Sequence, residues 1–373
     1  MIQATNISVY IDMIPDPRTC RLEHNFVDIV TIALLAKICG AEGWEDMEEF
    51  GLSRIDWLRS FLDLPAGIPS PDTFRRVISH IDPTPFLEAF LEWIRAVKNV
   101  LPGLVNIDGK TLRSASKRGE HPLHIVSAWC DKNHMVLGHL RNESKSNEVK
   151  AIPELLKQLI LPEGSIVTID AAGTQKNIAS QIQGMGADYV LALKGNQPAL
   201  RDEVANYFDQ AAEAGDEYAP LNAFQAEEQG HGRLELRKIN ATDDLDWLPQ
   251  KEEWLGLRSI IKLESIRWSE GKRQQETKYY ISSLPPNAEV LAGVIRGHWS
   301  VESRCHWVLD VVFAEDRSPI MEGHAPENLR ALNILAAKML KEEKSCRKGI
   351  RAKRFKAALD NDYLHRVLLA ANF

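Results

Sequence analysis

The sequence predicts an α/β fold, in which a mixed sheet with flanking helices follows a small all-α domain. Apolar residues recur at helical spacing through most of residues 23–100, whereas from Val105 onward short apolar runs typical of strands alternate with helical patterns. The chain has 373 residues, with 44% hydrophobic and 26% charged side chains, which is an ordinary globular composition. This length is enough for about two or three domains with a sizeable core.

The first 100 residues are predicted to form the helical domain. We expect helices at 27–39, 44–50, 53–61 and 85–100, and a further one that starts at Ser70, since serine is a good N-cap and Pro71 fits the first helical position. Short helices joined by tight turns are compatible with a helix-turn-helix DNA-binding unit and equally compatible with a plain helical cap.

The next part of the chain predicts a five-stranded sheet. Strands are expected at 105–108, 124–129, 135–140, 166–170 and 189–193, with helices at 147–159 and 175–183. A helical crossover before the strand that ends at Asp170 permits Asp170 to lie beside Asp108. This order of elements is that of ribonuclease H-like folds, so we expect a ribonuclease H-like mixed sheet.

A β-rich insertion is predicted at 216–284, because short segments of alternating polarity replace the helical pattern there. A long helix is then expected from about Asn287, and it carries Glu302. Four-residue spacing predicts that His298, Glu302 and His306 share one face of this helix, with Asp310 near its far end.

Three carboxylates stand in settings that favour metal-dependent chemistry on DNA: Asp108 in VNIDGK, Asp170 in IVTIDAAGTQ and Glu302 in IRGHWSVESRCHW. Each aspartate closes an apolar run that is typical of a buried strand. A carboxylate held against an apolar layer is unfavourable unless it is paired or binds a metal. The alternative for each aspartate, at even odds, is capping of the following helix or turn.

A zinc site is the less favoured alternative. His298 and His306 are eight residues apart, whereas a zinc pair on a helix needs one turn, so either histidine is better explained as a hydrogen-bonded side chain beside the site. The five cysteines are scattered without a CxxC pair and are expected to be reduced thiols.

The charge distribution is uneven. The net charge of −7 argues against a protein coated in basic residues, yet residues 338–356 contain nine basic and two acidic side chains. The basic C-terminal segment at 341–373 is therefore a candidate for phosphate contacts, with a solvated helix face as the alternative. The apolar stretch 27–39 contains Asp28 and Lys37 and is too short to span a bilayer.

Many segments in a fixed order resemble the H-repeat-associated transposases, a bacterial insertion-sequence family of the DDE superfamily. They include CGAEGWEDMEEFG, NIDGKTLR, TIDAAGTQ, YVLALKGNQ, HWSVESRCHWVLDVVFAED and RAKRFKAALDNDYL. The resemblance implies an N-terminal transposase-associated domain at 1–100. It also implies a catalytic domain at 101–215 and 285–340 that uses Asp108, Asp170 and Glu302 as its DDE triad.

The resemblance also implies the cofactor and the reaction. Two Mg²⁺ ions about 3.5–4 Å apart, for which Mn²⁺ can substitute, would be bridged by Asp108 and held singly by Asp170 and Glu302. Water would nick the element end, and the freed 3′-OH would attack target DNA. The wider superfamily places tyrosine, arginine and lysine around the glutamate, where this chain has Ile295, His298 and Leu309. Helper residues are therefore sought among His298, Arg296 and His306.

The expected partners are the terminal inverted repeats of the element and target DNA, bound by a homodimer or higher oligomer, with no membrane partner. We expect a cytoplasmic, nucleoid-associated bacterial protein. A nuclease of the same fold that never joins strands, and an inactive DNA-binding remnant of a mobile element, remain alternatives. The candidate DNA contacts are Lys110, Arg113, Lys145, Lys194, Gln197, His231, Arg233, Arg351, Lys353 and Arg354.

Overall fold

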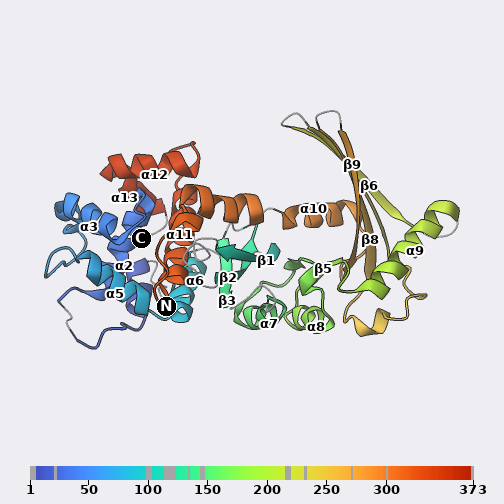
Figure 1. Cartoon of the computed structure of the whole chain (residues 1–373), viewed down its shortest axis with the longest axis horizontal. Coiled ribbons are helices and arrows are strands. Elements are labelled where there is room, and N and C mark those ends of the chain that lie inside the picture. The colour runs from blue at the N-terminus through green and yellow to red at the C-terminus, as the bar shows by residue number, and fades with distance from the viewer. Residues whose placement is uncertain are drawn as a thin grey trace. The chain divides into compact units, whose positions relative to one another are not determined.

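The chain divides into two compact units by the contacts between its residues. Unit 1 comprises the described residues within Met1–Val100, Thr111–Leu123 and Glu302–Phe373, and unit 2 those within Leu101–Lys110 and His124–Val301. The computed structural model (Figure 1) describes residues 6–20, 23–97, 103–112, 123–132, 135–142, 148–214, 220–230, 233–269, 272–299 and 301–370.

Unit 2 is built on a nine-stranded sheet in the order β3-β2-β1-β4-β5-β9-β8-β7-β6. β4 pairs in parallel with both β1 and β5, and β2 pairs antiparallel with β3, so the sheet is mixed. The predicted α/β, ribonuclease H-like fold class is confirmed. The five strands expected from the sequence are β1 (Leu104–Leu112), β2 (Leu123–Cys130), β3 (Met135–Asn142), β4 (Ile166–Ile169) and β5 (Asp188–Leu193).

The β-rich stretch continues this sheet. β9 pairs antiparallel with β5, from Val190 opposite Ser282 to Leu193 opposite Tyr279, and β8, β7 and β6 follow by antiparallel pairing. Figure 1 shows these long strands extending the sheet away from α7 and α8. Residues of the predicted insertion thus add four strands to one sheet: β6 (Asn222–Gly230), β7 (Arg233–Thr242), β8 (Ser259–Ser269) and β9 (Lys272–Ser282).

The helices of unit 2 pack on both the first and the second half of the sheet. α7 (Glu148–Gln158) contacts β3, α8 (Lys176–Gly184) contacts β5, and α9 (Pro198–Ala214) contacts β8 and β9. α10 (Ala288–His298) buries Leu291 and Val294 against Ile239 and Ile261 of the later strands. The core of unit 2 therefore runs from β1 to the extended strands, and α10 is the element that spans it.

The predicted long helix through Glu302 is wrong. α10 starts at the N-cap Asn287, whose side chain accepts a hydrogen bond from the Val290 N–H at 3.1 Å, and it ends at His298. The chain then enters two π-helical segments, η5 (Glu302–His306) and η6 (Val308–Val312). Because π-helical bonds join residues i and i+5, the four-residue spacing does not define one face from His298 to Asp310.

Unit 1 joins helices from both ends of the chain. α11 packs against α2, α5 and α6, and α12 packs against α2, so contacts between distant residues define this unit. Asn328 of α11 donates two hydrogen bonds to the last turn of α5, to the carbonyls of Ile78 at 2.8 Å and Ile81 at 2.9 Å. The N-terminal helices are α1 (Ile7–Asp12), α2 (Phe26–Cys39), α3 (Trp44–Ser53), α4 (Ile55–Leu58), α5 (Pro71–His80) and α6 (Pro83–Val97), and the C-terminal ones are α11 (Ala325–Glu342), α12 (Ile350–Leu359) and α13 (Asn361–Ala370).

The contacts therefore divide the chain differently from the domain boundaries expected from the sequence. Residues 302–340 and 341–373 were expected in a catalytic domain and a separate basic segment, yet both group with the N-terminal helices. The reason is α2, whose residues are buried almost all round and therefore need partners on every side. Among the described helices, none combines the length and the apolar composition needed to cross a membrane.

Two predicted DNA contacts in the basic segment are corrected by the structure. Lys353 is 5% exposed, and its ammonium donates to the backbone carbonyls of Leu340, at 2.8 Å, and Glu343. Arg354 is 9% exposed, donates to the carbonyls of Val312 and Lys37, and lies 4.2 Å above the Phe313 ring. Both cations satisfy carbonyls inside unit 1, because buried backbone oxygens near helix ends need donors.

Substituting Gly297 by alanine should loosen the contact of α10 with β1. A Cβ at Gly297 would clash with Cδ2 of Leu104, whereas a Cβ at Gly293 in the same helix meets nothing within 4 Å. We expect Gly297→Ala to lower the free energy of unfolding by about 1–2 kcal/mol. The control Gly293→Ala should raise it by about 0.5–1 kcal/mol, since alanine favours a helix over glycine. Urea unfolding of both variants measures this, and equal stabilisation by both would contradict the close packing.

Glu343 should make unit 1 sensitive to acid. Burial by itself raises the pKa of Glu343, but hydrogen bonds from Ser345, Tyr363 and Cys346 lower it from 4.5 to about 2. A lowered folded-state pKa contributes stability above pH 4.5, and this contribution is lost as the pH falls from 4.5 towards 2.

The variant Glu343→Gln should therefore be less stable than wild type by about 2–3 kcal/mol at neutral pH. The difference should shrink as the pH falls from about 4.5 to about 2 in urea titrations. Glu88→Gln removes an exposed carboxylate on α6 and is the matched control for the loss of one negative charge. A constant difference between wild type and Glu343→Gln across this range would disprove the linkage.

Candidate active site

The pairing of β1 with β4 brings two of the predicted acids together. Ile107 is the partner of Ile169 in the parallel register, so the next residues are Asp108 in β1 and Asp170 directly after β4. Neighbouring strands lie about 4.8 Å apart. Alternation of side chains puts Asp108 on the same face as Asn106, and Asp170 on the same face as Thr168. The structure thus places Asp170 beside Asp108, as the crossover predicted.

Asp170 also caps the turn that follows it. Its Oδ1 accepts hydrogen bonds from the N–H groups of Ala172, at 3.1 Å, and Gly173, at 3.4 Å, in the 3₁₀ turn Ala171–Gly173. The capping alternative is therefore confirmed for this residue. It engages one carboxylate oxygen, and among the described residues nothing hydrogen-bonds to Oδ2. Capping and metal binding are compatible, since a carboxylate has about four lone-pair sites.

The motif KGNQ braces this turn from the next strand. Asn196 donates to the carbonyl of Ala171, Gln197 donates to the carbonyl of Thr174 at 3.1 Å, and the Thr174 hydroxyl donates to Ala192 at 2.7 Å. Gln197, a predicted DNA contact, therefore has a positioning contact within the fold. Asn196 was missed by the sequence reasoning, although it lies in a motif that carried the family resemblance.

A partly buried network of hydrogen bonds lies on the face of the sheet that carries the acids. The Thr168 hydroxyl lies 2.7 Å from Oδ1 of Asn106 and 2.9 Å from Nδ1 of His298. Nδ2 of Asn106 donates to the carbonyl of Gly297 at 3.1 Å. These hydrogen bonds fix the end of α10 to β1 and β4. The sequence reasoning missed Asn106 and Thr168, whose signal is a polar residue two positions before each aspartate.

His298 is partly buried beside Asp170. Burial lowers the pKa of His298 below its usual 6.5, and the ammonium of Lys278 acts in the same direction, while the Asp170 carboxylate opposes both. The neutral imidazole is thus favoured at physiological pH. Among the described residues, the His298 ring hydrogen-bonds to Thr168, through Nδ1.

The other residues near the end of α10 lie on the surface. Arg296 forms an ion pair with Glu228 of β6 at 2.5 Å. Trp299 is 59% exposed, and the Lys278 ammonium lies 5.3 Å from its ring centroid. Arg296 is therefore engaged in an exposed pair, and His298 is the predicted helper that contacts the strands carrying the aspartates.

Glu302 and His306 belong to unit 1. Both lie in η5, where Oε2 of Glu302 is 3.8 Å from Nδ1 of His306. The Glu302 side chain is 61% exposed, whereas that of His306 is buried. Three residues, 299–301, separate Glu302 from His298, the last residue of α10. A zinc site on one helix is not supported, because α10 ends at His298.

The remaining predicted DNA contacts stay predictions, and the structure shows the exposure of some of them. Lys194 and Arg351 are exposed, and Lys110, in β1, is half-buried. Arg113, Lys145 and His231 lie outside the described residues, as does the side chain of Arg233. Together with the buried Lys353 and Arg354, this leaves Lys110, Lys194 and Arg351 as basic candidates with described side chains.

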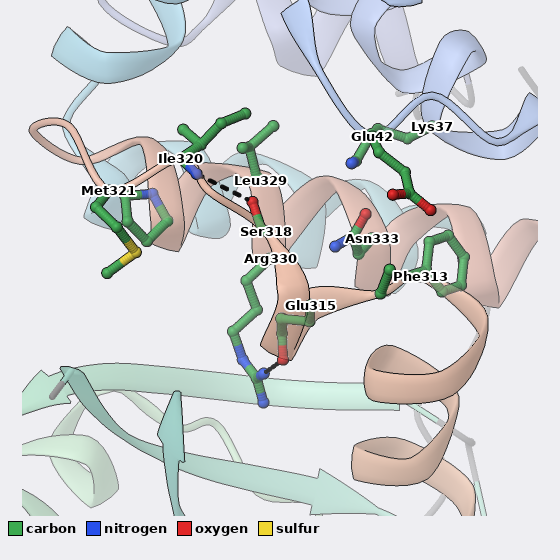
Figure 2. Close-up of a pocket in the computed structure, with 12 residues that line it drawn as sticks. Lys37, Glu42, Phe313, Glu315, Ser318, Ile320, Met321, Leu329, Arg330 and Asn333 are labelled. Atoms are coloured by element: carbon green, nitrogen blue, oxygen red, sulfur yellow. Dashed lines mark hydrogen bonds and ion pairs between the residues drawn. The ribbon is translucent and has the colours of Figure 1, made fainter. Parts of the chain in front are cut away.

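Unit 1 contains a pocket of about 460 Å³, including space open to solvent. Figure 2 shows the ion pair of Arg330 and Glu315, which is buried, in the wall of the pocket. Lys37 and Glu42 lie on the same side of the pocket as Asn333 (Figure 2). Burial lowers the pKa of Lys37 to about 8, and its ammonium donates to the carbonyl of Ala41 at 3.0 Å. None of the predicted site residues lines this pocket.

Comparison with protein families gives two matches in chain order. A model described as DDE_Tnp_1-associated matches residues 9–94, and a model of the transposase DDE domain matches residues 101–337. The first matches most of the N-terminal helices, and the second begins just before β1 and runs into α11. The second match alone covers more than half of the chain.

Individual relatives agree along nearly the whole length. The chain is 37% identical to the putative transposase YncI of Escherichia coli O157:H7, over 97% of this chain and 94% of the relative. It is 39% identical to the H repeat-associated putative transposase YhhI of Escherichia coli K12, over 96% of each. It is also 42% identical over 19% of its length to a protein named inactive transposase YbfQ of the same strain.

A solved structure of a piggyBac transposase synaptic complex with hairpin DNA is also similar, with 11% identity and a TM-score of 0.41 over 100% of this chain and 77% of that one. The family assignment does not depend on it. It follows from the domain matches and from relatives that span almost the entire sequence. The chain therefore belongs to the transposases with a DDE domain, and within them to the H-repeat-associated transposases.

Proposed function

We propose that this chain is the DNA transposase of a bacterial insertion sequence, which cuts element ends by metal-dependent hydrolysis and joins the 3′-OH to target DNA. The observation that carries the proposal is the register of β1 and β4, in which Asp108 and Asp170 directly follow the paired residues Ile107 and Ile169. Two carboxylates on neighbouring strands repel each other, and a divalent cation between them offsets the repulsion.

The residues present fit a magnesium site. Asp108 and Asp170 offer carboxylate oxygens, which are the hard ligands that Mg²⁺ prefers, and Oδ2 of Asp170 has no hydrogen bond within the described part of the chain. Glu302 is proposed as the third ligand, because it follows the end of α10 by four residues and its carboxylate is largely exposed. Two bound Mg²⁺ ions, or Mn²⁺, would supply charge stabilisation to the attacking and leaving oxygens.

The protein's own residues would hold the reacting groups in place. The turn after Asp170 is fixed by Asn196, Gln197 and Thr174, so the carboxylate is presented on a braced loop. The end of α10 is fixed by Asn106 and Thr168. Such prearrangement matters because phosphodiester transfer depends mainly on positioning and charge stabilisation.

DNA would be bound in part by basic side chains. Lys110 follows Asp108 by two residues, Lys194 lies in the KGNQ motif, and Arg351 is exposed on α12. We propose the element ends and target DNA as the ligands, a dimer or higher oligomer as the DNA-bound form, and the bacterial nucleoid as the place of action. Phosphate contacts of this kind predict an affinity that falls with rising salt concentration.

The reaction can be tested with DNA that carries the ends of the element encoding this chain. Incubation with Mg²⁺ or Mn²⁺ should release nicked ends, and pre-cleaved ends should be joined to a target plasmid. Cutting without joining would favour the nuclease alternative. DNA binding without any metal-dependent product would favour an inactive remnant, a fate that the name of the similar YbfQ protein records for that relative.

Asp170→Asn separates the metal role of this residue from its capping role. Asparagine keeps an oxygen that accepts from the N–H groups of Ala172 and Gly173, and it caps about as well as aspartate. We expect stability within about 0.5 kcal/mol of wild type, but strand cutting reduced at least about 100-fold. Asp170→Ala should lose both. Unchanged cutting by Asp170→Asn in the end-cleavage assay would show that the residue serves only as a cap.

Glu302→Gln tests the third acid. The carboxylate is largely exposed, so the substitution should leave folding unchanged. Cutting should fall at least about 100-fold, with DNA affinity in a gel-shift assay retained. Glu289→Gln, at an exposed acid on α10, is the matched control and should cut like wild type. If Glu302→Gln and Glu289→Gln cut equally well, another residue must complete the site.

A further inference from the structure

The hydrogen bonds around His298 define which of its ring nitrogens carries the proton. The network of hydrogen bonds begins at the Gly297 carbonyl, which can only accept. Nδ2 of Asn106 donates to this carbonyl at 3.1 Å. The amide of Asn106 is thereby oriented, with Oδ1 directed to Thr168. This oxygen can also only accept, so the Thr168 hydroxyl, 2.7 Å away, gives its single proton to Asn106.

Thr168 can then act only as an acceptor towards His298. The two atoms, Oγ1 of Thr168 and Nδ1 of His298, are 2.9 Å apart, so Nδ1 must carry the hydrogen. In the neutral ring this leaves a lone pair on Nε2. Within the described part of the chain, no side chain or backbone group hydrogen-bonds to Nε2. The network therefore presents Nε2 of His298 as an acceptor. This acceptor is held rigidly, since Asn106 is 0% exposed and Thr168 is 2% exposed.

This acceptor lies beside the acids. Asn106 and Thr168 precede Asp108 and Asp170 by two residues on the same face of the two paired strands. We propose that Nε2 of His298 accepts a hydrogen bond from the nucleophile, which is water in end cutting and the 3′-OH in joining, and so orients the attacking oxygen. Asn106 and Thr168 are the positioning residues that fix the tautomer. The inference rests on the proposed function for its substrate, but the tautomer does not depend on it.

The alternative role for the residue at position 298 is to donate a hydrogen bond to a DNA phosphate. Arginine, which the wider superfamily often has at this offset from the glutamate, can only donate and would bind phosphate oxygens. An Nδ1-protonated, neutral histidine cannot donate from Nε2. The two roles therefore predict opposite behaviour for the variant His298→Arg.

The tautomer can be measured without DNA or metal. In ¹⁵N-labelled protein at pH 8, correlation spectra of the imidazoles should show His298 with a protonated Nδ1 and an unprotonated Nε2, assigned by its absence in His298→Arg. Thr168→Ser keeps the hydroxyl and should keep this pattern, whereas Thr168→Val should mix the two tautomers. A wild-type signal with the proton on Nε2 would overturn the inference, whatever the DNA assays show.

Single-turnover cutting of element ends tests the role of the acceptor. Thr168→Val and His298→Arg should cut roughly 10–100-fold more slowly at saturating DNA, while DNA affinity without metal stays within about twofold for Thr168→Val. Thr168→Ser is the control and should cut within a few-fold of wild type. Thermal melting identifies a variant that fails to fold, and if Thr168→Val is that variant, His298→Arg carries the comparison with wild type.

The outcomes separate the two proposals. If His298→Arg cuts as fast as wild type, His298 is a phosphate contact and the acceptor role is wrong. If Thr168→Val cuts as fast as wild type although its tautomers are mixed, the fixed lone pair does not orient the nucleophile. If wild type cuts no DNA, the proposed function and the role of the acceptor fail together, while the spectra still decide the protonation of His298.

Discussion

The parallel pairing of β1 with β4 is the constraint on which the candidate site depends. Its register sets Asn106 beside Thr168, and two residues later it sets Asp108 beside Asp170. A slip of one residue would move each of these side chains to the opposite face of the sheet. The hydrogen bond between Asn106 and Thr168 at 2.7 Å is buried, so the register is stabilised at the point where the acids need it.

From this pair of strands the same network reaches α10. Gly297 permits α10 to approach β1 closely. The Gly297 carbonyl and the ring of His298 complete the network of hydrogen bonds. The Gly297 carbonyl can only accept, and this fixes in turn which atoms of Asn106, Thr168 and His298 donate and which accept. A static arrangement of heavy atoms can therefore determine a protonation state. A connected network of hydrogen bonds restrains its side chains, and rigidity suits a site that positions phosphodiester groups.

Charged residues serve two different purposes in this chain. In unit 1, Lys353 and Arg354 donate to backbone carbonyls, and Arg330 pairs with Glu315 away from solvent. In unit 2, Asp170 presents one carboxylate oxygen after capping with the other. The sequence contains the same residue types in both settings. A run of lysine and arginine therefore predicts neither DNA binding nor burial until the groups they face are known.

The order of strands and helices in unit 2, and the proximity of the two aspartates, could be predicted from the sequence because they follow from local periods of two and 3.6 residues and from the crossover rule. The motifs likewise determined the family. Tertiary structure alone decided that α10 ends at His298, that residues 302–373 pack with the N-terminal helices, and that Nδ1 of His298 bonds to Thr168. These features depend on contacts between residues far apart in the chain, such as the 130 positions between Thr168 and His298, and no local pattern records them.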